Sequence, residues 1–279
     1  MINVNSNISS IFAQRRLSKS QEGLNKAMAR LTTGLRINSA ADDAAGLAVG
    51  TRMQTQIRSL EQAKRNAGDG ISASQTAESS MEQMTDVLSR LRELSIQSSN
   101  GALNNGDRSF LHTEFSDLVT ELDRLAQNTE FNGIKLLDGG VSAGLTFHVG
   151  SGNTANDKIT ISITNMRANK LGAGGVFLDT QSVSTSAKAQ TSLGIIDGAL
   201  TQIGAVRSKL GSFQNRLGIT IDNIGSSVEN LSASKARIMD ADIAKETAAL
   251  TRNQILVQAG VSVLAQANQA PQIALSLLG

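Results

Sequence analysis

Apolar side chains recur at intervals of three and four residues through most of the chain, which is the spacing of amphipathic helices. The pattern is most continuous over about residues 192–236, where nearly every expected position is Ile, Leu, Val or Phe. It also covers about residues 44–99 and 107–128, and the segment NGALNNGD at 100–107 separates these two stretches. A short break of this kind predicts that the helix at 107–128 returns antiparallel against the end of the helix at 44–99.

Both ends of the chain carry thinner apolar stripes with a period of seven. The first stripe ends near Leu35, with Met28 at the alternate seam position, and the second begins after Asp240 or Asp242 and ends at Pro271. Ala, Ser, Gln and Gly fill most other positions, so a lone helix pair has too little apolar area to offset its ordering entropy. We therefore expect the residues that mark the stripes to be buried between subunits of an assembly. They are Leu17, Leu24, Leu31, Ile243, Leu250, Val257 and Leu264.

Strict alternation of apolar and polar residues replaces the helical spacing in the middle of the chain. It covers residues 145–149 and 159–163 on either side of a turn that contains Gly and Asp, which predicts a β-hairpin with one apolar face. A short strand is predicted at 134–137. Residues 165–190 are rich in Gly, Ser, Thr and Ala without a period, so we expect a loop there, including the Gly-rich segment 172–175. We expect most of this loop to be dispensable for assembly.

These patterns together predict a mainly α fold: an elongated antiparallel helical rod or coiled-coil bundle, with a small β-hairpin region at its distal end. The chain folds back on itself, so the first helix pairs with the last one, and the second and third pair with the fourth. We divide it into three regions. Residues 1–43 with 237–279 form the paired terminal helices, residues 44–140 with 191–236 form a helical bundle, and residues 141–190 form a short β-hairpin and variable loop region.

The composition excludes several functional classes. The 279 residues include no Cys, which excludes disulfides and thiolate metal sites, and the single Pro leaves long helices uninterrupted. The formal net charge of +2 is nearly balanced, so nucleic acid is not an expected partner. No run of about 18 apolar residues is present, so we expect no membrane insertion. The N-terminus lacks the pattern of a cleavable signal peptide, which on its own would place the protein in the cytoplasm.

Candidate catalytic and metal-binding residues are sparse. His112 and His148 lie far apart in the sequence, and no HExxH helix is present, so a zinc protease site is not expected. The segment 172–175 lacks the strand-then-helix context of a phosphate-binding loop. The neighbouring residues Asp42 and Asp43 are compatible with a cation site, but negative charge at the start of a helix is the simpler interpretation. We therefore expect no enzyme activity, no cofactor and no metal.

Several sequence motifs resemble those of the bacterial flagellins. They occur in the family's order and cover roughly residues 1–140 and 190–279. The resemblance implies a structural subunit of the flagellar filament that polymerises into a helical tube and acts as the motility propeller. The interval between the third motif and the fourth predicted helix is short, so the large variable outer domains of many flagellins are absent. The motifs are LTTGLRINSAADDAAGLAV at 31–49, RLRELSIQ at 90–97, TEFNGIKLL at 129–137, ARIMDADIAKE at 236–246 and ILVQAGVSVLAQA at 255–267.

The resemblance also assigns roles to the regions of the chain. The paired terminal helices resemble the inner core of the filament, and the bundle resembles the outer wall. Arg90, Leu94 and Glu114 match the family's pattern of contacts with the Toll-like receptor that senses flagellin, while packing between subunits is the alternative role for the same residues. The tail IALSLLG resembles the element that cytosolic inflammasome receptors recognise, although it ends in Gly279, where many relatives carry a basic residue.

The partners implied by the resemblance are further copies of the chain in an open helical polymer, an export chaperone, hook-associated and cap proteins, and host receptors that sense flagellin. The implied location is the extracellular flagellum, reached by flagellar type III export without a cleaved signal peptide. Two other functions stay open. A filament–hook junction protein shares the same terminal plan, whereas a secreted coiled-coil adhesin would form an oligomer of fixed size rather than a polymer whose contacts never close.

Overall fold

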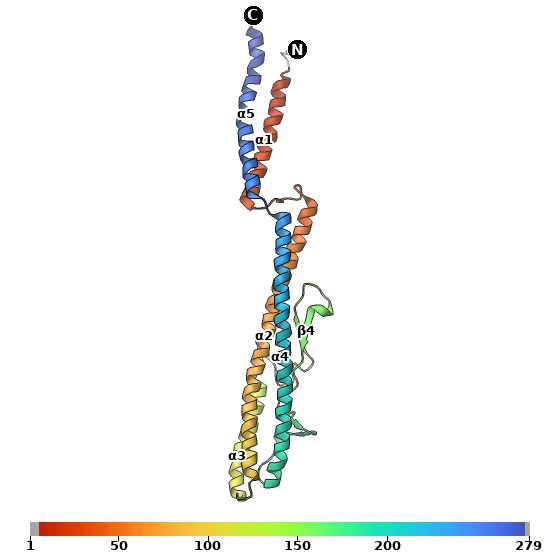
Figure 1. Cartoon of the computed structure of the whole chain (residues 1–279), viewed down its shortest axis with the longest axis vertical. Helices are drawn as coiled ribbons and strands as arrows, with labels where there is room; N and C mark the ends of the chain where they lie inside the picture. Colours follow the sequence, from red (N-terminus) through yellow and green to blue (C-terminus); the bar gives the residue numbers. More distant parts are fainter. Residues whose placement is uncertain (1–5, 277–279) are drawn as a thin grey trace. The chain divides into compact units, whose positions relative to one another are not determined.

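The computed structural model describes residues 6–276, and the side chains of residues 6–269, as a mainly α-helical chain with small antiparallel strand pairs (Figure 1). The predicted mainly α fold class is confirmed. The helices of the described residues are α1 (Ile8–Thr33), α2 (Ala44–Ser99), α3 (Asn105–Asn128), α4 (Ser186–Met239) and α5 (Ile243–Ser276), with short 3-10 turns η1 (Ala155–Asp157) and η2 (Leu178–Thr180). The strand pairs are β1 (Glu130–Phe131) with β2 (Ile134–Lys135), β3 (Leu145–His148) with β4 (Lys158–Ile161), and β5 (Gly172–Ala173) with β6 (Val176–Phe177).

Contacts divide the chain into two compact units. The first contains the chain up to Ile57 together with the chain from Glu229 onward, and therefore holds α1, α5 and the adjoining ends of α2 and α4. The second unit is Arg58–Val228 and contains the rest of α2 and α4, all of α3 and the strand pairs.

The core of the second unit lies between α2 and α4. Positions seven residues apart on α2, which the sequence pattern singles out, are buried: Leu60, Ala67, Ser74, Met81 and Leu88. The facing positions on α4 are buried as well, at Ile196, Ile203, Leu210 and Leu217. Polar contacts connect the same two helices, because Gln214 donates to Glu78 at 2.9 Å and Arg92 donates to Asp197 at 2.8 Å. The predicted pairing of these two helices is confirmed.

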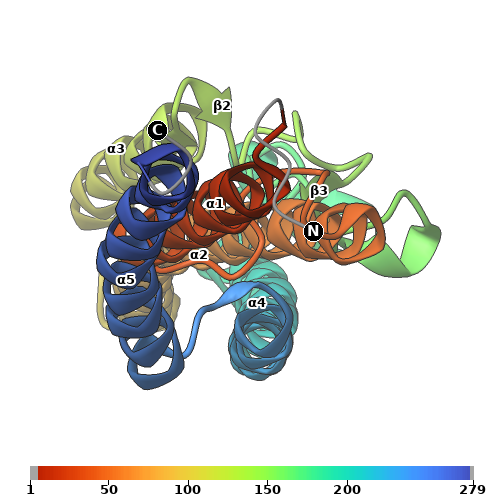
Figure 2. The ribbon, with the colours of Figure 1, turned by 90° about the horizontal axis from the view of Figure 1, so that it is seen from above.

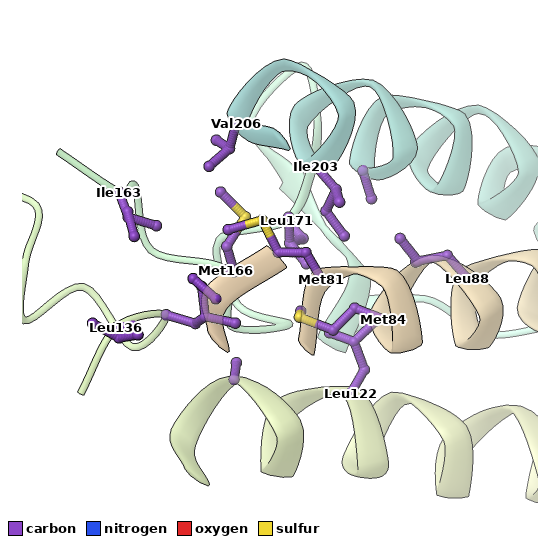
Figure 3. Packing of buried hydrophobic residues seen from close by; sticks show 14 of the residues in the cluster. Met81, Met84, Leu88, Leu122, Leu136, Ile163, Met166, Leu171, Ile203 and Val206 are labelled. Atoms are coloured by element: carbon purple, nitrogen blue, oxygen red, sulfur yellow. The ribbon is translucent and has the colours of Figure 1, made fainter. Parts of the chain in front are cut away.

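Helix α3 returns along α2 because both sides of the turn between them are capped. The Asn104 side chain accepts from the Asp107 amide at 2.9 Å, which starts α3. The buried Arg108 donates to the carbonyl oxygens of Ser98 and Asn100, both at 2.8 Å, and so satisfies acceptors at the end of α2. Leu122 of α3 is fully buried beside Met84 of α2 (Figure 3).

One strand pair follows the sequence pattern closely, and a second follows it in part. Strands β3 and β4 pair antiparallel from Leu145 opposite Ile161 to His148 opposite Lys158, as the alternation predicts. The strand predicted at 134–137 is shorter, because β2 contains two residues and pairs with β1 across a tight turn. Asn132 and Gly133 in this turn have φ of 49° and 77°, which is the left-handed conformation that a type I′ hairpin turn requires at both positions.

Residues 165–185 form a loop with a little local structure, as expected, but this loop is packed against the core. Five of the apolar side chains between residues 165 and 185 are at most 3% exposed: Met166, Ala168, Leu171, Leu178 and Val183. Met166 and Leu171 lie beside Ile203 and Val206 of α4 (Figure 3), and Gly174 and Gly175, with φ of 62° and 83°, form the turn of the β5–β6 hairpin. A backbone that turns this often buries side chains at irregular intervals, so the sequence shows no period.

Two helix boundaries differ from the prediction. Helix α4 begins at Ser186 rather than near residue 192, and α5 continues through Pro271 to Ser276 rather than ending at the proline. Pro271 has no amide hydrogen to donate to the carbonyl oxygen of Ala267. The side chain of Asn7 donates to that oxygen instead, at 2.7 Å, so the interruption leaves no unpaired acceptor.

Candidate assembly interface

Helices α1 and α5 lie side by side and antiparallel in the first unit (Figures 1 and 2). At one end of the pair, Ser10 donates from Oγ to Asn268 Oδ1 at 2.7 Å. At the other end, Arg30 forms an ion pair with Glu246, with 3.1 Å between Nη1 and Oε1, and the Glu246 side chain is buried. The predicted pairing of the first and last helices is confirmed.

Small residues let the two helices approach closely. Ala13 and Ala27 are buried in the seam, and a Cβ built on Gly260 would lie 3.2 Å from Leu17. On the other helix, a Cβ at Gly23 would lie 3.0 Å from the side chain of Asn253. The pair therefore buries little apolar area of its own.

The predicted seam residues fall into two classes. Six of them are half-buried between α1 and α5: Leu17, Leu24, Leu31, Leu250, Val257 and Leu264. The seventh, Ile243, is 54% exposed at the start of α5. Met28, at the alternate seam position, is 54% exposed as well, and the smaller Ala27 occupies the buried position next to it.

Large apolar side chains lie exposed on both helices of the pair. Exposed large apolar side chains on both helices of a pair favour an interaction site over a free surface. These residues are Ile8, Ile11, Phe12, Ile255, Leu256, Val261 and Val263.

Two crossing connections join this helix pair to α2 and α4 within the first unit. Helix α1 ends at Gly34, whose φ of 70° is the left-handed conformation of a helix stop. The connections then bridge: the Ala241 amide donates to Gly34 O at 2.9 Å, and the Arg36 amide donates to Met239 O at 2.7 Å. These two hydrogen bonds hold the segment after α1 against the segment before α5. They fix how the two connections align with each other.

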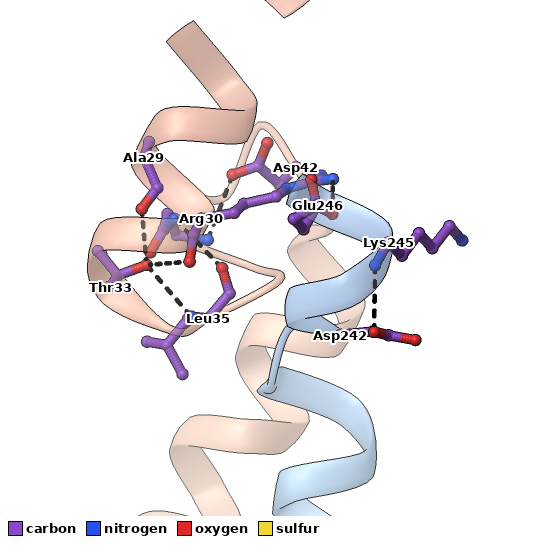
Figure 4. Close-up of polar contacts among 9 residues, drawn as sticks. Ala29, Arg30, Thr33, Leu35, Asp42, Asp242, Lys245 and Glu246 are labelled. Carbon is purple, nitrogen blue, oxygen red and sulfur yellow. Dashed lines mark hydrogen bonds and ion pairs between the residues drawn. The ribbon is translucent and has the colours of Figure 1, made fainter. Parts of the chain in front are cut away.

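Two of the three aspartates around these connections start the next helices, and Figure 4 shows one of them, Asp242, with its partner Lys245. Asp43 accepts from the Gly46 amide at 2.8 Å, and Asp242 accepts from the Lys245 amide at 3.2 Å, as helix N-caps do. Asp42 instead closes the turn before α2, and the hydrogen bond from the Ser39 hydroxyl lowers the pKa of its carboxyl. The helix-start interpretation therefore applies to Asp43, and a turn-closing role applies to Asp42.

The predicted receptor residues lie on α2 and α3 of the second unit. Arg90 donates to Glu114 Oε1 from Nη2 at 2.8 Å and from Nε at 3.0 Å, and this hydrogen bonding raises the pKa of the arginine. Both side chains are accessible, at 49% and 44% exposed. Leu94 is fully buried in the core. Arg90 and Glu114 therefore form an accessible pair, whereas the fully buried Leu94 offers no surface to a partner in this structure.

Among the residues that the structure describes, the other candidate catalytic and metal-binding side chains are not brought together. His112 lies on α3 and His148 at the end of β3, and no three His, Asp or Glu residues in the described chain are grouped as metal ligands. Across residues 6–276, no helix has both the length and the apolar character needed to cross a bilayer.

Comparison with known proteins relates both halves of this arrangement to one family. The bacterial flagellin N-terminal helical region matches residues 4–142, and the bacterial flagellin C-terminal helical region matches residues 193–278. The flagellar filament 33 kDa core protein of Treponema phagedenis is 43% identical over 285 residues, an alignment that covers 99% of each chain. The crystal structure of Bacillus cereus flagellin matches with a TM-score of 0.50 and 26% identity, over 61% of this chain and 94% of that one. A putative flagellar hook-associated protein from Vibrio parahaemolyticus matches with a TM-score of 0.61 over 71% of this chain and 100% of that one, and its 16% identity shows a shared fold alone.

Proposed function

The chain belongs to the bacterial flagellin family and is a structural subunit of the flagellar filament, and we propose that the α1/α5 pair carries its main polymerisation contacts. It is a flagellin without large outer domains, since the Treponema phagedenis relative aligns over nearly its whole length. The proposal rests on one observation: large apolar side chains are exposed on both α1 and α5, while the contact between these two helices buries little apolar area. In a tube, neighbouring copies would cover that surface on several sides.

The small apolar area buried between α1 and α5 supports coupled folding and assembly. Its seam contains Ala13, Ala27, Gly23 and Gly260, and its predicted leucines are half-buried. An isolated helix pair of this kind is marginal in water, because its apolar contacts scarcely offset the entropy of ordering. We infer that the pair becomes stably ordered when a subunit docks on the growing end of the filament.

Hydrogen exchange tests this mechanism directly. In the monomer, the amides of residues 10–35 and 243–265 should exchange fast while the amides of the α2/α4 core are protected. In filaments, both sets should be protected. Strong protection of the terminal helices before assembly would show that they are prefolded and would overturn the mechanism.

We further propose three functional regions of the chain. Residues 1–43 with 237–279 would form the inner core of the filament, residues 44–140 with 191–236 the outer core, and residues 141–190 an outer hairpin region. Loosely ordered terminal helices favour passage through a narrow channel, so we propose export in an unfolded state by the flagellar type III route to an extracellular filament. An export chaperone on α5 and hook-associated and cap proteins at the filament ends are the partners that this route implies.

The accessible pair Arg90 and Glu114 supports a second interaction. These side chains present fixed, opposite charges on neighbouring helices, with 2.8 Å between Nη2 and Oε1. We propose that a host receptor that senses flagellin binds this surface in the free subunit. Because the side chains are half-exposed, their value to the stability of the fold is small, and they are available to a partner. The corresponding proposal for the inflammasome concerns IALSLLG at 273–279, which lies outside the described side chains.

The family is one of structural proteins, and we propose that this chain has no catalytic activity and uses no cofactor. The Glu114 carboxylate is committed to Arg90, and Asp43 to the start of α2, so neither is free as an acid or base. Purified filaments should therefore lack hydrolase activity towards peptide, phosphoester and glycoside substrates.

A further inference from the structure

Three Asn-Gly dipeptides occur in the second unit, at residues 100–101, 105–106 and 132–133. In such a dipeptide the backbone nitrogen of the glycine can attack the side-chain carbonyl carbon of the asparagine, because glycine has no side chain to hinder the approach. Ring closure also requires the backbone at the asparagine to be free to rotate. The structure gives the three dipeptides different backbone environments, so their reactivity should differ.

The dipeptide at 100–101 lies in an exposed turn directly after α2. A Cβ built on Gly101 would meet no atom within 4 Å, so the space around this residue is open. Among the described residues, the Gly101 amide has no hydrogen-bond partner. The nitrogen that must attack is therefore exposed to solvent, and its proton is available to hydroxide.

The carbonyl that must be attacked is activated by the same turn. The Ala102 amide donates to Asn100 Oδ1 at 3.1 Å, and the ring that this hydrogen bond closes contains both the Asn100 side-chain carbonyl and the Gly101 nitrogen. A backbone donor on Oδ1 polarises the carbonyl and stabilises the negative charge that develops on the oxygen during attack. The turn therefore holds an activated carbonyl beside an unpaired amide.

The other two dipeptides are held by regular structure. Residues 105–106 begin α3, and the side-chain oxygen of Asn105 accepts from Arg108 Nη1 at 3.3 Å. Asn132 and Gly133 form the turn of the paired strands β1 and β2, with φ of 49° and 77°. Rotation of the backbone at either asparagine would break a helix start or a hairpin turn, so ring closure is opposed at both places.

We propose that Asn100 is a self-modification site, which converts to aspartate and isoaspartate without an enzyme. Hydroxide removes the amide proton of Gly101, whose nitrogen forms a bond to Asn100 Cγ, and the side-chain amide leaves as ammonia. Water then opens the resulting succinimide. Cleavage between the nitrogen and Cγ gives aspartate, and cleavage between the nitrogen and the backbone carbonyl carbon gives isoaspartate.

The products alter the turn that joins α2 to α3. Both add a negative charge, and isoaspartate also reroutes the backbone through the former side chain. The backbone carbonyl oxygen of Asn100 at present accepts from Arg108 Nη2 at 2.8 Å, and Arg108 is buried. Isoaspartate moves this acceptor, so the modification marks an old subunit at a contact that closes the end of the bundle.

Timed incubation of the full-length protein in mildly alkaline buffer tests the proposal. Mass spectrometry of proteolytic peptides measures the conversion of each asparagine, and fragmentation within the peptide separates Asn100 from Asn105, since no Lys or Arg lies between them. In the folded protein, Asn100 should convert at least about tenfold faster than Asn105 and Asn132. In urea the three rates should become similar, because the structure that distinguishes them is lost. Labelling by an isoaspartyl methyltransferase reports the isoaspartate product.

Two glycine variants locate the reaction. Gly101→Ala should slow the conversion of Asn100 by about tenfold or more, because the added methyl group hinders the attacking nitrogen. The matched control is Gly218→Ala, at an α4 position where an added Cβ also meets no atom within 4 Å, and its rate at Asn100 should equal that of the wild type. Circular dichroism should show unchanged helix content for both variants.

Three outcomes would overturn the proposal: equal rates at the three asparagines of the folded protein, faster conversion at Asn132 than at Asn100, or an unchanged rate at Asn100 in the Gly101→Ala variant. The first two are measured on the wild type, so they do not depend on how a variant folds. None of them bears on filament formation, which sedimentation measures separately.

Discussion

The side chain of Asn7 donates a hydrogen bond of 2.7 Å to the carbonyl oxygen of Ala267. In an uninterrupted helix this oxygen would accept from the amide of residue 271, which here is a proline without an amide hydrogen. The same Asn7 side chain accepts from the Ser10 amide at 3.0 Å and so caps α1. One residue therefore starts α1 and satisfies the acceptor that the proline leaves in α5.

The first prediction tests this double role with a mutant cycle. Asn7→Ser keeps an N-cap acceptor but is too short to reach α5, so it should destabilise the helix pair by about 1 kcal/mol, the value of one hydrogen bond. In a Pro271→Ala background the helix supplies its own donor, and the same substitution should cost much less. The readout is the midpoint temperature of filament disassembly. Equal shifts in both backgrounds would show that Asn7 acts through the cap alone.

A second prediction separates polymerisation from folding. Ile255 and Val261 are 59% and 54% exposed on α5, so replacing both with Asp should leave the thermal melting of the subunit unchanged. The critical concentration for polymerisation should rise by at least about tenfold, because two charges would have to be buried between copies. The half-buried Leu250 and Val257 are poorer targets, since Asp there would also disrupt the helix pair itself.

The control for this experiment is Gln258→Asp, an exposed polar position on the same helix. It adds a charge without removing an apolar side chain, and its critical concentration should lie closer to that of the wild type. If Ile255→Asp with Val261→Asp polymerises normally, the exposed apolar face of α5 is not an assembly contact.

The third prediction concerns the packed segment that the sequence pattern indicated as a loop. Leu171→Ala removes a fully buried side chain next to α4 and should destabilise the second unit by about 2–5 kcal/mol. Val176→Ala, at a 43% exposed position in the same segment, should change the stability by less than about 0.5 kcal/mol. Urea unfolding of both variants measures the difference, and similar midpoints would place Leu171 outside the core.

The hydrophobic periodicity of the sequence predicts the helices and strands that have one buried face. The bounds of α2, Ala44–Ser99, match the prediction because one side of the helix is buried at a regular period and a Gly- and Asn-rich turn follows it. The pairing of β3 with β4 was predictable for the same reason, since alternation marks a strand with one buried face.

Periodicity fails where burial depends on contacts with distant segments. Leu171 and Leu178 belong to a core cluster that also contains residues of α2 and α4, and no local pattern shows this. Helix α5 continues through Pro271, and Asn7, far away in the sequence, satisfies the freed carbonyl. In the candidate sites, Arg90 and Glu114 were identified by resemblance to known motifs. The ion pair of Arg30 with Glu246 had no sequence signal beyond two opposite charges on helices expected to pair.

The fourth prediction concerns the proposed receptor surface. Replacing Arg90 and Glu114 together with Ala should sharply reduce signalling by monomer through a host receptor that senses flagellin, because both charges of an accessible pair are removed. The matched control replaces Glu121 and Arg124, another exposed ion pair on α3, with 2.6 Å between Arg124 Nη2 and Glu121 Oε1. Polymerisation must be measured in parallel. Full signalling at a matched monomer concentration would exclude this surface.

The last prediction uses the pH dependence of an ion pair in the second unit. Arg167 donates to both carboxylate oxygens of Asp123, at 3.0 Å from Nε and 3.1 Å from Nη2. These hydrogen bonds lower the pKa of Asp123 below its ordinary value of 3.8. A carboxyl with a lowered pKa in the folded state stabilises the fold at every pH above its unfolded pKa. That stability is lost as the pH falls through the folded value, where the carboxylate becomes protonated.

Asp123→Asn should therefore destabilise the second unit by about 1 kcal/mol near neutral pH, since the pair is partly exposed, and by progressively less as the pH falls below about 4. Urea unfolding of wild type and variant across this range measures the difference. Asp117→Asn is the control, because Asp117 is an exposed carboxylate of the same helix without an ion-pair partner in the described chain. A destabilisation by Asp123→Asn that stays constant down to strongly acidic pH would mean that the charge of Asp123 does not contribute, and that the effect comes from altered packing of the amide against Arg167.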